Sequence, residues 1–208
     1  MASDLTTSTK RMKVAEQIKT LLEKYPTSEI AGRYARALVN AISEMTTVTE
    51  CMKVAKQIKI LLETYPTSEI AVRYAKALVN ATAEMTTVTE CMKVAEQIKA
   101  LLGTYPTSEI AEIYASALIN ATARMTTAIE CMEVAEKIES LLKTYPTSKI
   151  AERYVRVFVA MFLLTDSYHE KEKSIQKIEE ILKQYPTEEI KWWHQLCIEY
   201  LNEETEDE

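Results

Sequence analysis

The prolines of the chain stand at a constant spacing of 40 residues, and this spacing constrains the fold more than any other feature. The five prolines are Pro26, Pro66, Pro106, Pro146 and Pro186. They divide the chain into repeat units at 5–44, 45–84, 85–124, 125–164 and 165–204. The second unit is identical to the third at 32 of 40 positions and to the first at 29 of 40. A fixed period in this range is typical of stacked repeats with one continuous core, so we expect a single repeat domain over 1–208.

Each unit has the pattern of two helices. In the second unit, apolar residues recur at spacings of three and four over Val48–Tyr65, which predicts one buried helix face. Pro66 ends this helix, because its ring disfavours helical geometry at the preceding residue and removes a backbone donor. Thr67 or Ser68 then caps a second helix that runs to about Glu84. With only two glycines in the chain, the links are short and neighbouring helices are antiparallel. The predicted fold is all-α, a solenoid of five helix-turn-helix repeats with about ten helices.

A capping box is expected at the start of the first helix in most units. In Thr47-Val48-Thr49-Glu50, the Thr47 hydroxyl can accept from the Glu50 backbone N–H while the Glu50 side chain reaches back. The same pairs recur as Thr87 and Glu90, Thr127 and Glu130, and Ser167 and Glu170. The first unit has Lys10 where the glutamate is wanted, so its first helix should start less firmly.

The overall charge and hydropathy limit the partners that the chain can have. A net charge of −6 favours solubility and argues against general nucleic-acid binding. The longest apolar stretch, Val157–Leu164, is too short to span a membrane, and the N-terminal residues lack an apolar signal-peptide core. We therefore expect a cytoplasmic protein without a membrane partner.

Cysteine and histidine are too few and too scattered for most site chemistry. Three of the four cysteines, Cys51, Cys91 and Cys131, share one repeat position, where neighbouring helices lie too far apart for a disulfide. We expect buried, reduced thiols at all four. The only histidines are His169 and His194, and there is no Cys-x-x-Cys pair or glycine-rich phosphate loop. The sequence therefore predicts no metal, no cofactor and no enzymatic activity.

The terminal units depart from the repeat, as solenoid ends must if they are not to expose a stacking face. In the first unit, Ser8 and Arg11 stand where the second unit has Val48 and Cys51, which predicts a solvent-exposed face. The fifth unit has a charged first helix, and its end at 202–208 is an acidic tail that we expect to fray. Adjacent Trp192 and Trp193 cannot face the same way on a helix. One is expected to pack in the terminal unit, and the other is a candidate aromatic anchor for a partner.

The unit resembles the tetratricopeptide repeat family in the segments PTSEIAVRYAKALVN (Pro66–Asn80) and VAEQIKALLGTYP (Val94–Pro106). The resemblance extends over about Leu5–Leu201. It implies a right-handed superhelix in which the helix after each Tyr-Pro lines a concave groove. The family's usual unit is about 34 residues long, its first-helix Trp and Gly are absent here, and HEAT-like repeats have a period nearer 40.

A ladder of polar side chains follows the second helices in repeat register and is the candidate binding site. The four positions represented by Glu69, Arg73, Lys76 and Asn80 fall on one side of a helix. The ladder residues are Arg33, Arg36, Asn40, Arg73, Lys76, Asn80, Asn120, Arg153 and Arg156. An amide offers a donor and an acceptor to a peptide backbone, and the cations can pair with carboxylates. The Arg36-x3-Asn40 and Lys76-x3-Asn80 spacings are similar to the carboxylate clamp of tetratricopeptide domains. The third unit, with Ile113 and Ser116, and the fourth, with Ala160, break that pattern.

These observations favour a non-enzymatic scaffold that binds a protein or an acidic extended peptide through the second-helix face. The ladder is alternatively the ordinary solvated face of an amphipathic helix. Another hypothesis is a structural protein whose near-identical units pack end to end or as a homo-oligomer. Binding of nucleic acid along the Arg/Lys stripe is a weaker third hypothesis.

Overall fold

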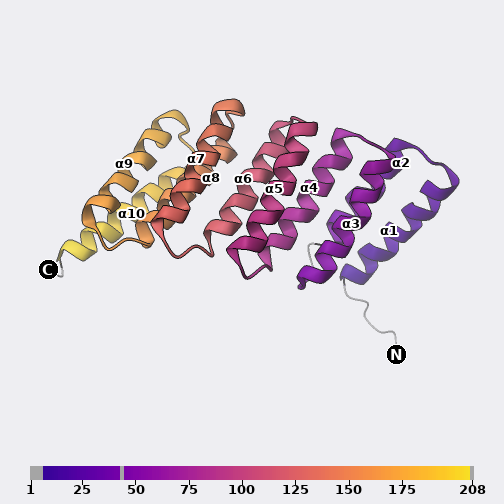
Figure 1. Cartoon of the computed structure of the whole chain (residues 1–208), viewed down its shortest axis with the longest axis horizontal. Helices are drawn as coiled ribbons and strands as arrows, with labels where there is room; N and C mark the ends of the chain where they lie inside the picture. The colour runs from indigo at the N-terminus through magenta and orange to yellow at the C-terminus, as the bar shows by residue number, and fades with distance from the viewer. Residues whose placement is uncertain (1–6, 43–44, 207–208) are drawn as a thin grey trace. The chain divides into compact units, whose positions relative to one another are not determined.

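The structure, a computed structural model, describes residues 7–42 and 45–206. Within these ranges the chain forms ten α-helices and no strand. The helices are α1 (Thr7–Lys24), α2 (Ser28–Ile42), α3 (Val48–Thr64), α4 (Ser68–Ala83), α5 (Val88–Thr104), α6 (Ser108–Thr122), α7 (Ala128–Thr144), α8 (Ser148–Leu163), α9 (Tyr168–Gln184) and α10 (Glu188–Glu206). They form an α-solenoid of helical repeats with one pair of helices per 40-residue unit (Figure 1). The expected first residue of the first unit, Leu5, and the junction at 43–44 lie outside the described residues.

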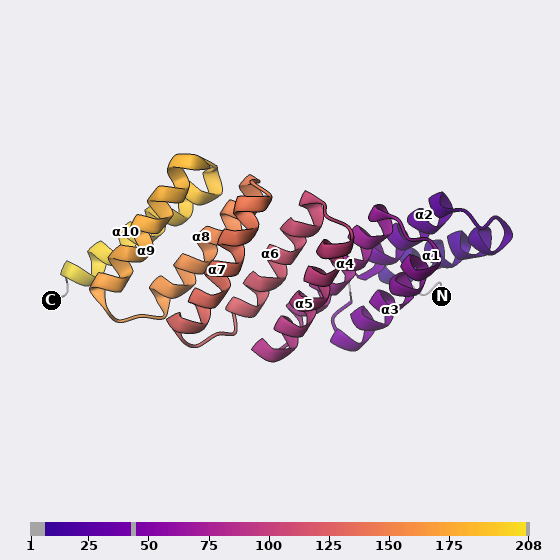
Figure 2. The same ribbon diagram turned by 45° about the horizontal axis from the view of Figure 1, so that its top comes forward.

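The contacts divide the chain into two compact units. The first comprises Met1–Thr86 and Lys93–Tyr114, and the second comprises Thr87–Met92 and Ala115–Glu208. In the first, α2 packs against α1, α3 and α4. In the second, α8 packs against α7, α9 and α10 (Figures 1 and 2). The second helix of a pair is thus the one that joins it to the next pair, as expected when each repeat contacts only its neighbours.

The Tyr-Pro links end one helix and start the next through a fixed set of hydrogen bonds. The Tyr65 N–H donates to the Leu61 carbonyl at 2.7 Å, which closes the last turn of α3. The Thr67 N–H then donates to the Tyr65 carbonyl at 2.8 Å, and the Thr67 hydroxyl accepts from the Ile70 N–H at 3.3 Å. Thr67 is therefore the cap of α4, and Ser68 is its first helical residue.

The capping boxes form, with one difference from the expected geometry. The Thr47 hydroxyl accepts from the Glu50 N–H at 3.3 Å, as predicted. The Glu50 carboxylate, however, accepts from the Thr47 hydroxyl at 2.8 Å rather than from its backbone N–H. The box at Thr87 is built in the same way. In the fourth unit, the Glu130 carboxylate accepts from the Thr127 hydroxyl and also from the backbone N–H of Thr126.

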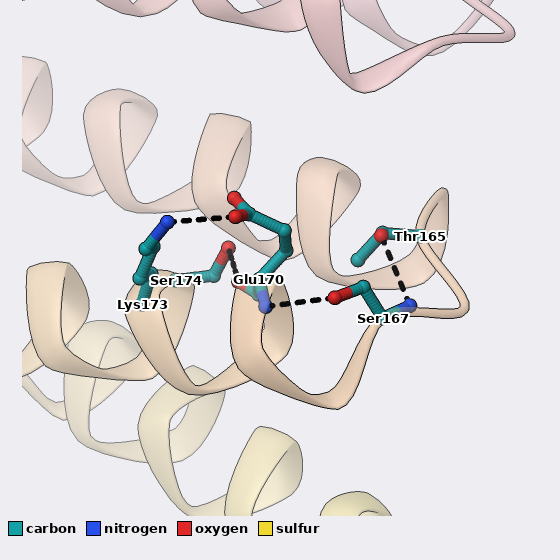
Figure 3. A network of polar contacts seen from close by, with 5 residues as sticks. All are labelled: Thr165, Ser167, Glu170, Lys173 and Ser174. Carbon is teal, nitrogen blue, oxygen red and sulfur yellow. Dashed lines mark hydrogen bonds and ion pairs between the residues drawn. The ribbon is translucent and has the colours of Figure 1, made fainter.

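The fifth unit keeps only half of the box (Figure 3). The Ser167 hydroxyl accepts from the Glu170 N–H at 3.5 Å, and the Thr165 hydroxyl accepts from the Ser167 N–H at 3.2 Å. The Glu170 carboxylate turns instead to Lys173, whose Nζ lies 2.7 Å away, while the Ser174 hydroxyl donates to the Glu170 carbonyl. This ion pair lowers the pKa of Glu170. At the start of α9, the glutamate of the box therefore pairs with a lysine, whereas in the second to fourth units it accepts a hydrogen bond from a threonine hydroxyl.

All four cysteines are buried and carry free thiols, as expected from their repeat position. Burial raises the pKa of each thiol, and it raises that of Cys197 to about 11. A thiol with a raised pKa is a poor nucleophile at neutral pH, because the thiolate is the reactive form. These side chains therefore act as small apolar core residues.

The terminal units have features of their own. Lys171 is buried at the position that Cys51, Cys91 and Cys131 occupy, with its ammonium 5.5 Å from the ring centre of Phe162 and 5.9 Å from that of Tyr200. The helix α10 extends through Glu206, and residues 207–208 of the expected acidic tail lie outside the described residues. At the front, Arg11 is half-buried and donates to the Asn40 carbonyl at 2.9 Å, while the Ser8 side chain is not among those described.

Among the described residues, no helix combines the length and the apolar character that crossing a membrane requires.

Candidate functional site

The front part of the ladder lies on α2 and α4, which pack against each other. Arg33, Arg36 and Asn40 are exposed on α2. Arg73, Lys76 and Asn80 are half-buried on α4. The structure thus brings the six predicted residues of the first two units onto adjoining helices.

Most of these cations already have acidic partners within the protein. Arg33 lies 2.7 Å from Glu29 on its own helix, and Arg73 lies 3.9 Å from Glu69. The exposed pair at Arg33 contributes little to stability, but both pairs lower the charge that a ligand would meet. The predicted ladder therefore carries its own carboxylates beside its cations.

One glutamate in the first turn of the second helices reaches back to the preceding unit. Glu109 at the start of α6 places a carboxylate oxygen 2.6 Å from Lys76 Nζ on α4. Glu69, at the same repeat position on α4, lies against Gly32 of α2, where an added Cβ would come within 3.1 Å of its carboxylate. Glu69 and Glu109, which share one repeat position, therefore both contact the second helix of the preceding unit. Lys76 belongs to this contact more than to an open ligand surface.

Arg36 is the exception in the front part of the ladder. It is exposed, and within the described residues it makes no hydrogen bond or ion pair. Asn40 is held through its carbonyl by Arg11. Arg36 is therefore the cation of α2 that is available to a ligand carboxylate.

The rear part of the ladder lies on α6 and α8, and most of its residues also have partners within the protein. Arg153 Nη1 lies 3.8 Å from Glu189 in the first turn of α10, and its Nε donates to the Ser116 hydroxyl at 3.3 Å. The Asn120 carbonyl accepts from Arg124 at 2.6 Å, which satisfies one of the open carbonyls at the end of α6. Arg156 is half-buried and, in the part of the chain that the structure describes, has no hydrogen bond or ion pair.

Arg156 lines a hollow of about 170 Å³ whose walls come from the second helices α6, α8 and α10. Its apolar lining includes Ile119, Val159, Ala160, Leu163 and Trp193. Ala160 stands where the earlier units carry asparagine, so the smaller side chain leaves this space open. The hollow thus joins an unpaired cation to an apolar surface, and two residues singled out from the sequence, Arg156 and Trp193, meet in it.

The two tryptophans face differently, as expected from their adjacency. Trp192 is exposed, whereas Trp193 is half-buried at the hollow. Their rings meet edge to face, with centroids 4.4 Å apart. The indole Nε1 of Trp193 is buried and has no hydrogen-bond partner within the structure. A buried donor without an acceptor is costly to the folded state.

A second concave surface, between α7 and α9, was not foreseen from the sequence. It consists of two adjoining pockets of about 440 and 340 Å³ floored by α8 residues that include Tyr154 and Phe158. Burial, together with nearby Glu139 and Glu180, raises the pKa of Tyr154 to about 12. Sequence periodicity marks these floor residues only as core, and no signal showed that α7 and α9 leave them partly open.

The charges around that groove largely neutralise one another. Lys177 lies 2.6 Å from Glu180, and Lys173 lies 2.7 Å from Glu170. Lys143 lies 3.2 Å from Glu139. The groove therefore offers an apolar floor but few unpaired charges with which to select a ligand. The hollow at Arg156 has the stronger chemical signature.

The described part of the chain contains no group of three or more His, Cys, Asp or Glu side chains that could hold a metal ion. His194 Nε2 lies 3.3 Å from a carboxylate oxygen of Glu179. The second helices offer charged groups, apolar surface and hydrogen-bonding groups to a ligand.

Compared with protein-family models, curated proteins and solved structures, the chain gives no match.

Proposed function

We propose that this protein is a non-enzymatic scaffold that binds an acidic, extended peptide segment along the second-helix face of a tetratricopeptide-like solenoid. The observation that carries the proposal is the hollow at Arg156. It combines an apolar cavity, an unpaired guanidinium and an unsatisfied indole donor on three successive second helices.

The chemistry of the hollow specifies the ligand. An aliphatic or aromatic side chain of the peptide fills the space beside Ala160 and Leu163. A carboxylate next to that side chain pairs with Arg156. A segment with an apolar residue next to acidic residues meets both requirements.

Arg36 on α2, in the first compact unit, is a separate contact point for an acidic group of a ligand. Arg33, Arg73, Lys76 and Arg153 have lower weight in this proposal, because each already lies near a glutamate of the protein. A cytoplasmic location is part of the proposal, since four free thiols suit a reducing compartment.

The test is selection from a random-peptide display library, followed by binding measurements on a selected synthetic peptide by fluorescence anisotropy. We expect selected sequences to combine acidic residues with one apolar anchor. The double variant Arg36→Glu and Arg156→Glu should weaken binding by about tenfold or more, because each change replaces an attraction by a repulsion.

The matched control is Lys53→Glu with Lys93→Glu, which makes the same change in charge on exposed first helices. It should leave the affinity within about twofold, since these side chains lie away from the second-helix face. Selection of no peptide above background would contradict the proposal. Equal losses in the two double variants would show that net charge alone attracts the peptide.

A second candidate function, a structural protein that self-assembles, is favoured by one specific observation. Apolar side chains of α1 that have buried counterparts in the inner units are exposed.

A further inference from the structure

The front face of α1 is apolar and open. Val14 and Leu21 are 50% and 51% exposed, and Tyr25 is exposed to a similar degree. The three lie at spacings of seven and four, so they form one stripe along the helix. The sequence predicts a solvent-exposed face on this first helix. Among the described residues, Arg11 is the polar replacement on which that expectation rested, and it is half-buried, while Val14, Leu21 and Tyr25 keep the apolar residues of the repeat.

The inner units show what this stripe is built to contact. The counterparts of Val14 and Leu21 in the second unit are Val54 and Leu61, which are only 4% and 8% exposed. Those residues lie on α3, and α3 packs against α2 of the preceding unit. The stripe on α1 is therefore a stacking face of the repeat that no described residue of the chain covers.

Basic side chains border this stripe. Lys10 and Lys24 each lie three or four residues from one of its members, on the same side of the helix. Both are exposed, and neither forms an ion pair within the described residues. The Lys24 ammonium lies 5.3 Å from the ring centre of Tyr25, directly beside the apolar surface.

The last helix carries a second open apolar stripe with the opposite charge at its border. Trp192, Leu196 and Tyr200 are exposed at successive spacings of four along α10. Glu199 and Glu203 lie three or four residues from members of this stripe and are also exposed. The opposite side of α10 is the buried one, where Ile190, Cys197 and Leu201 pack.

We propose that a second copy of this chain covers the front face, with α10 of one copy packed along α1 of the next. The apolar stripes meet, and the glutamates beside α10 face the lysines beside α1. Such a head-to-tail contact leaves one open face at each end of an assembly, so it adds copies into a chain, or into a ring where the rotation between copies closes.

The charges also select this pairing over the symmetric ones. Packing α1 against α1 would bring Lys10 and Lys24 of two copies together, and packing α10 against α10 would do the same for the glutamates. Like charges facing each other across an interface are unfavourable, whereas opposite charges attract. Of the three pairings, only the head-to-tail one joins complementary borders.

The experiment is sedimentation velocity on the 208-residue chain over a wide concentration range, with Leu21→Glu and Leu196→Glu as the two interface variants. Wild type should grow with concentration from 23.7 kDa through successive multiples of that mass. Each variant alone should stay at 23.7 kDa, because each retains only one of the two faces. An equimolar mixture should form a heterodimer and nothing larger, since one intact α10 face then meets one intact α1 face.

Ile60→Glu is the matched control, because Ile60 is an exposed apolar residue of α3 that belongs to neither stripe. It should associate as wild type does. If circular dichroism shows that either interface variant is unfolded, Val14→Glu and Trp192→Glu replace it on the same faces.

A wild-type chain that stays at 23.7 kDa at every concentration overturns the proposal. Dimers of Leu196→Glu alone would show that α1 pairs with α1, and dimers of Leu21→Glu alone would show that α10 pairs with α10. Either result, or a mixture without heterodimer, also overturns it.

Discussion

Lys76 Nζ on α4 lies 2.6 Å from a carboxylate oxygen of Glu109 on α6, 33 residues further along the chain. The sequence places Lys76 among the ligand-binding cations, and the structure places it in a contact between successive second helices. Arg153 and Glu189 repeat the relationship between α8 and α10 at 3.8 Å. The polar face of the second helices therefore carries contacts between units as well as ladder side chains without such contacts, which among the described residues include Arg36, Asn80 and Arg156.

Removing the Lys76–Glu109 pair should cost little stability, because both side chains are partly exposed to solvent. A double-mutant cycle with Lys76→Ala and Glu109→Ala should give a coupling of about 0.2–1 kcal/mol in the free energy of unfolding, measured by urea denaturation. Lys53→Ala, which removes an exposed lysine without an ion pair, is the control. Strictly additive single changes would show that the short distance contributes nothing measurable.

The fold followed from the sequence because period, proline position and capping residues all point to the same helices. The start of α4 at Ser68 and its cap at Thr67 are examples in which local chemistry decides. Lys171 shows what such reasoning leaves out. The sequence marks it only as part of a charged first helix, whereas the structure buries it near Phe162 and Tyr200.

The candidate site could be predicted from the sequence only in part. Helical spacing correctly put Arg36 and Arg156 on second helices, but it cannot reveal that Glu109 reaches Lys76 from the next unit. The hollow depends on the loss of a side chain at Ala160 and on three helices meeting around it. A single sequence shows the substitution but not the space that it leaves.

The capping boxes should contribute to stability through the Thr hydroxyl. Thr47→Ala removes both the acceptor for the Glu50 N–H and the donor to its carboxylate, so we expect a loss of about 0.5–2 kcal/mol. Amide hydrogen exchange should show faster exchange in the first turn of α3. Thr64→Ala is the control, because that hydroxyl only donates to the Ile60 carbonyl of its own helix. Equal losses in both variants would argue against the box.

Stability at high pH should depend on Tyr154. Burial raises its pKa from 10.0 to about 12, so between these values the native state holds a proton that the unfolded chain releases. The stability of wild type should therefore fall, relative to Tyr154→Phe, as pH rises from about 10 towards 12, by at most about 2–3 kcal/mol. Urea denaturation across this range measures the difference, with Tyr168→Phe as a control for removal of an exposed hydroxyl. A difference that stays constant with pH would contradict the prediction.

Filling the hollow should separate its role in binding from its role in stability. Ala160→Asn restores the residue found at Asn40, Asn80 and Asn120, and it places three more heavy atoms in a space of about 170 Å³. The peptide's apolar side chain then loses its cavity, so affinity should fall by about tenfold, which corresponds to about 1.4 kcal/mol. Peptide titrations followed by tryptophan fluorescence measure this, because Trp193 lines the hollow.

The free energy of unfolding of Ala160→Asn should change by no more than that of Ala100→Asn. Ala100→Asn makes the same helix-propensity change at an exposed position of α5. This expectation holds because the helical repeat accepts asparagine at this position in three other units. Unchanged affinity in a folded Ala160→Asn protein would show that the peptide anchors elsewhere. The groove floored by Tyr154 and Phe158 would then become the leading candidate, since it offers the larger apolar surface.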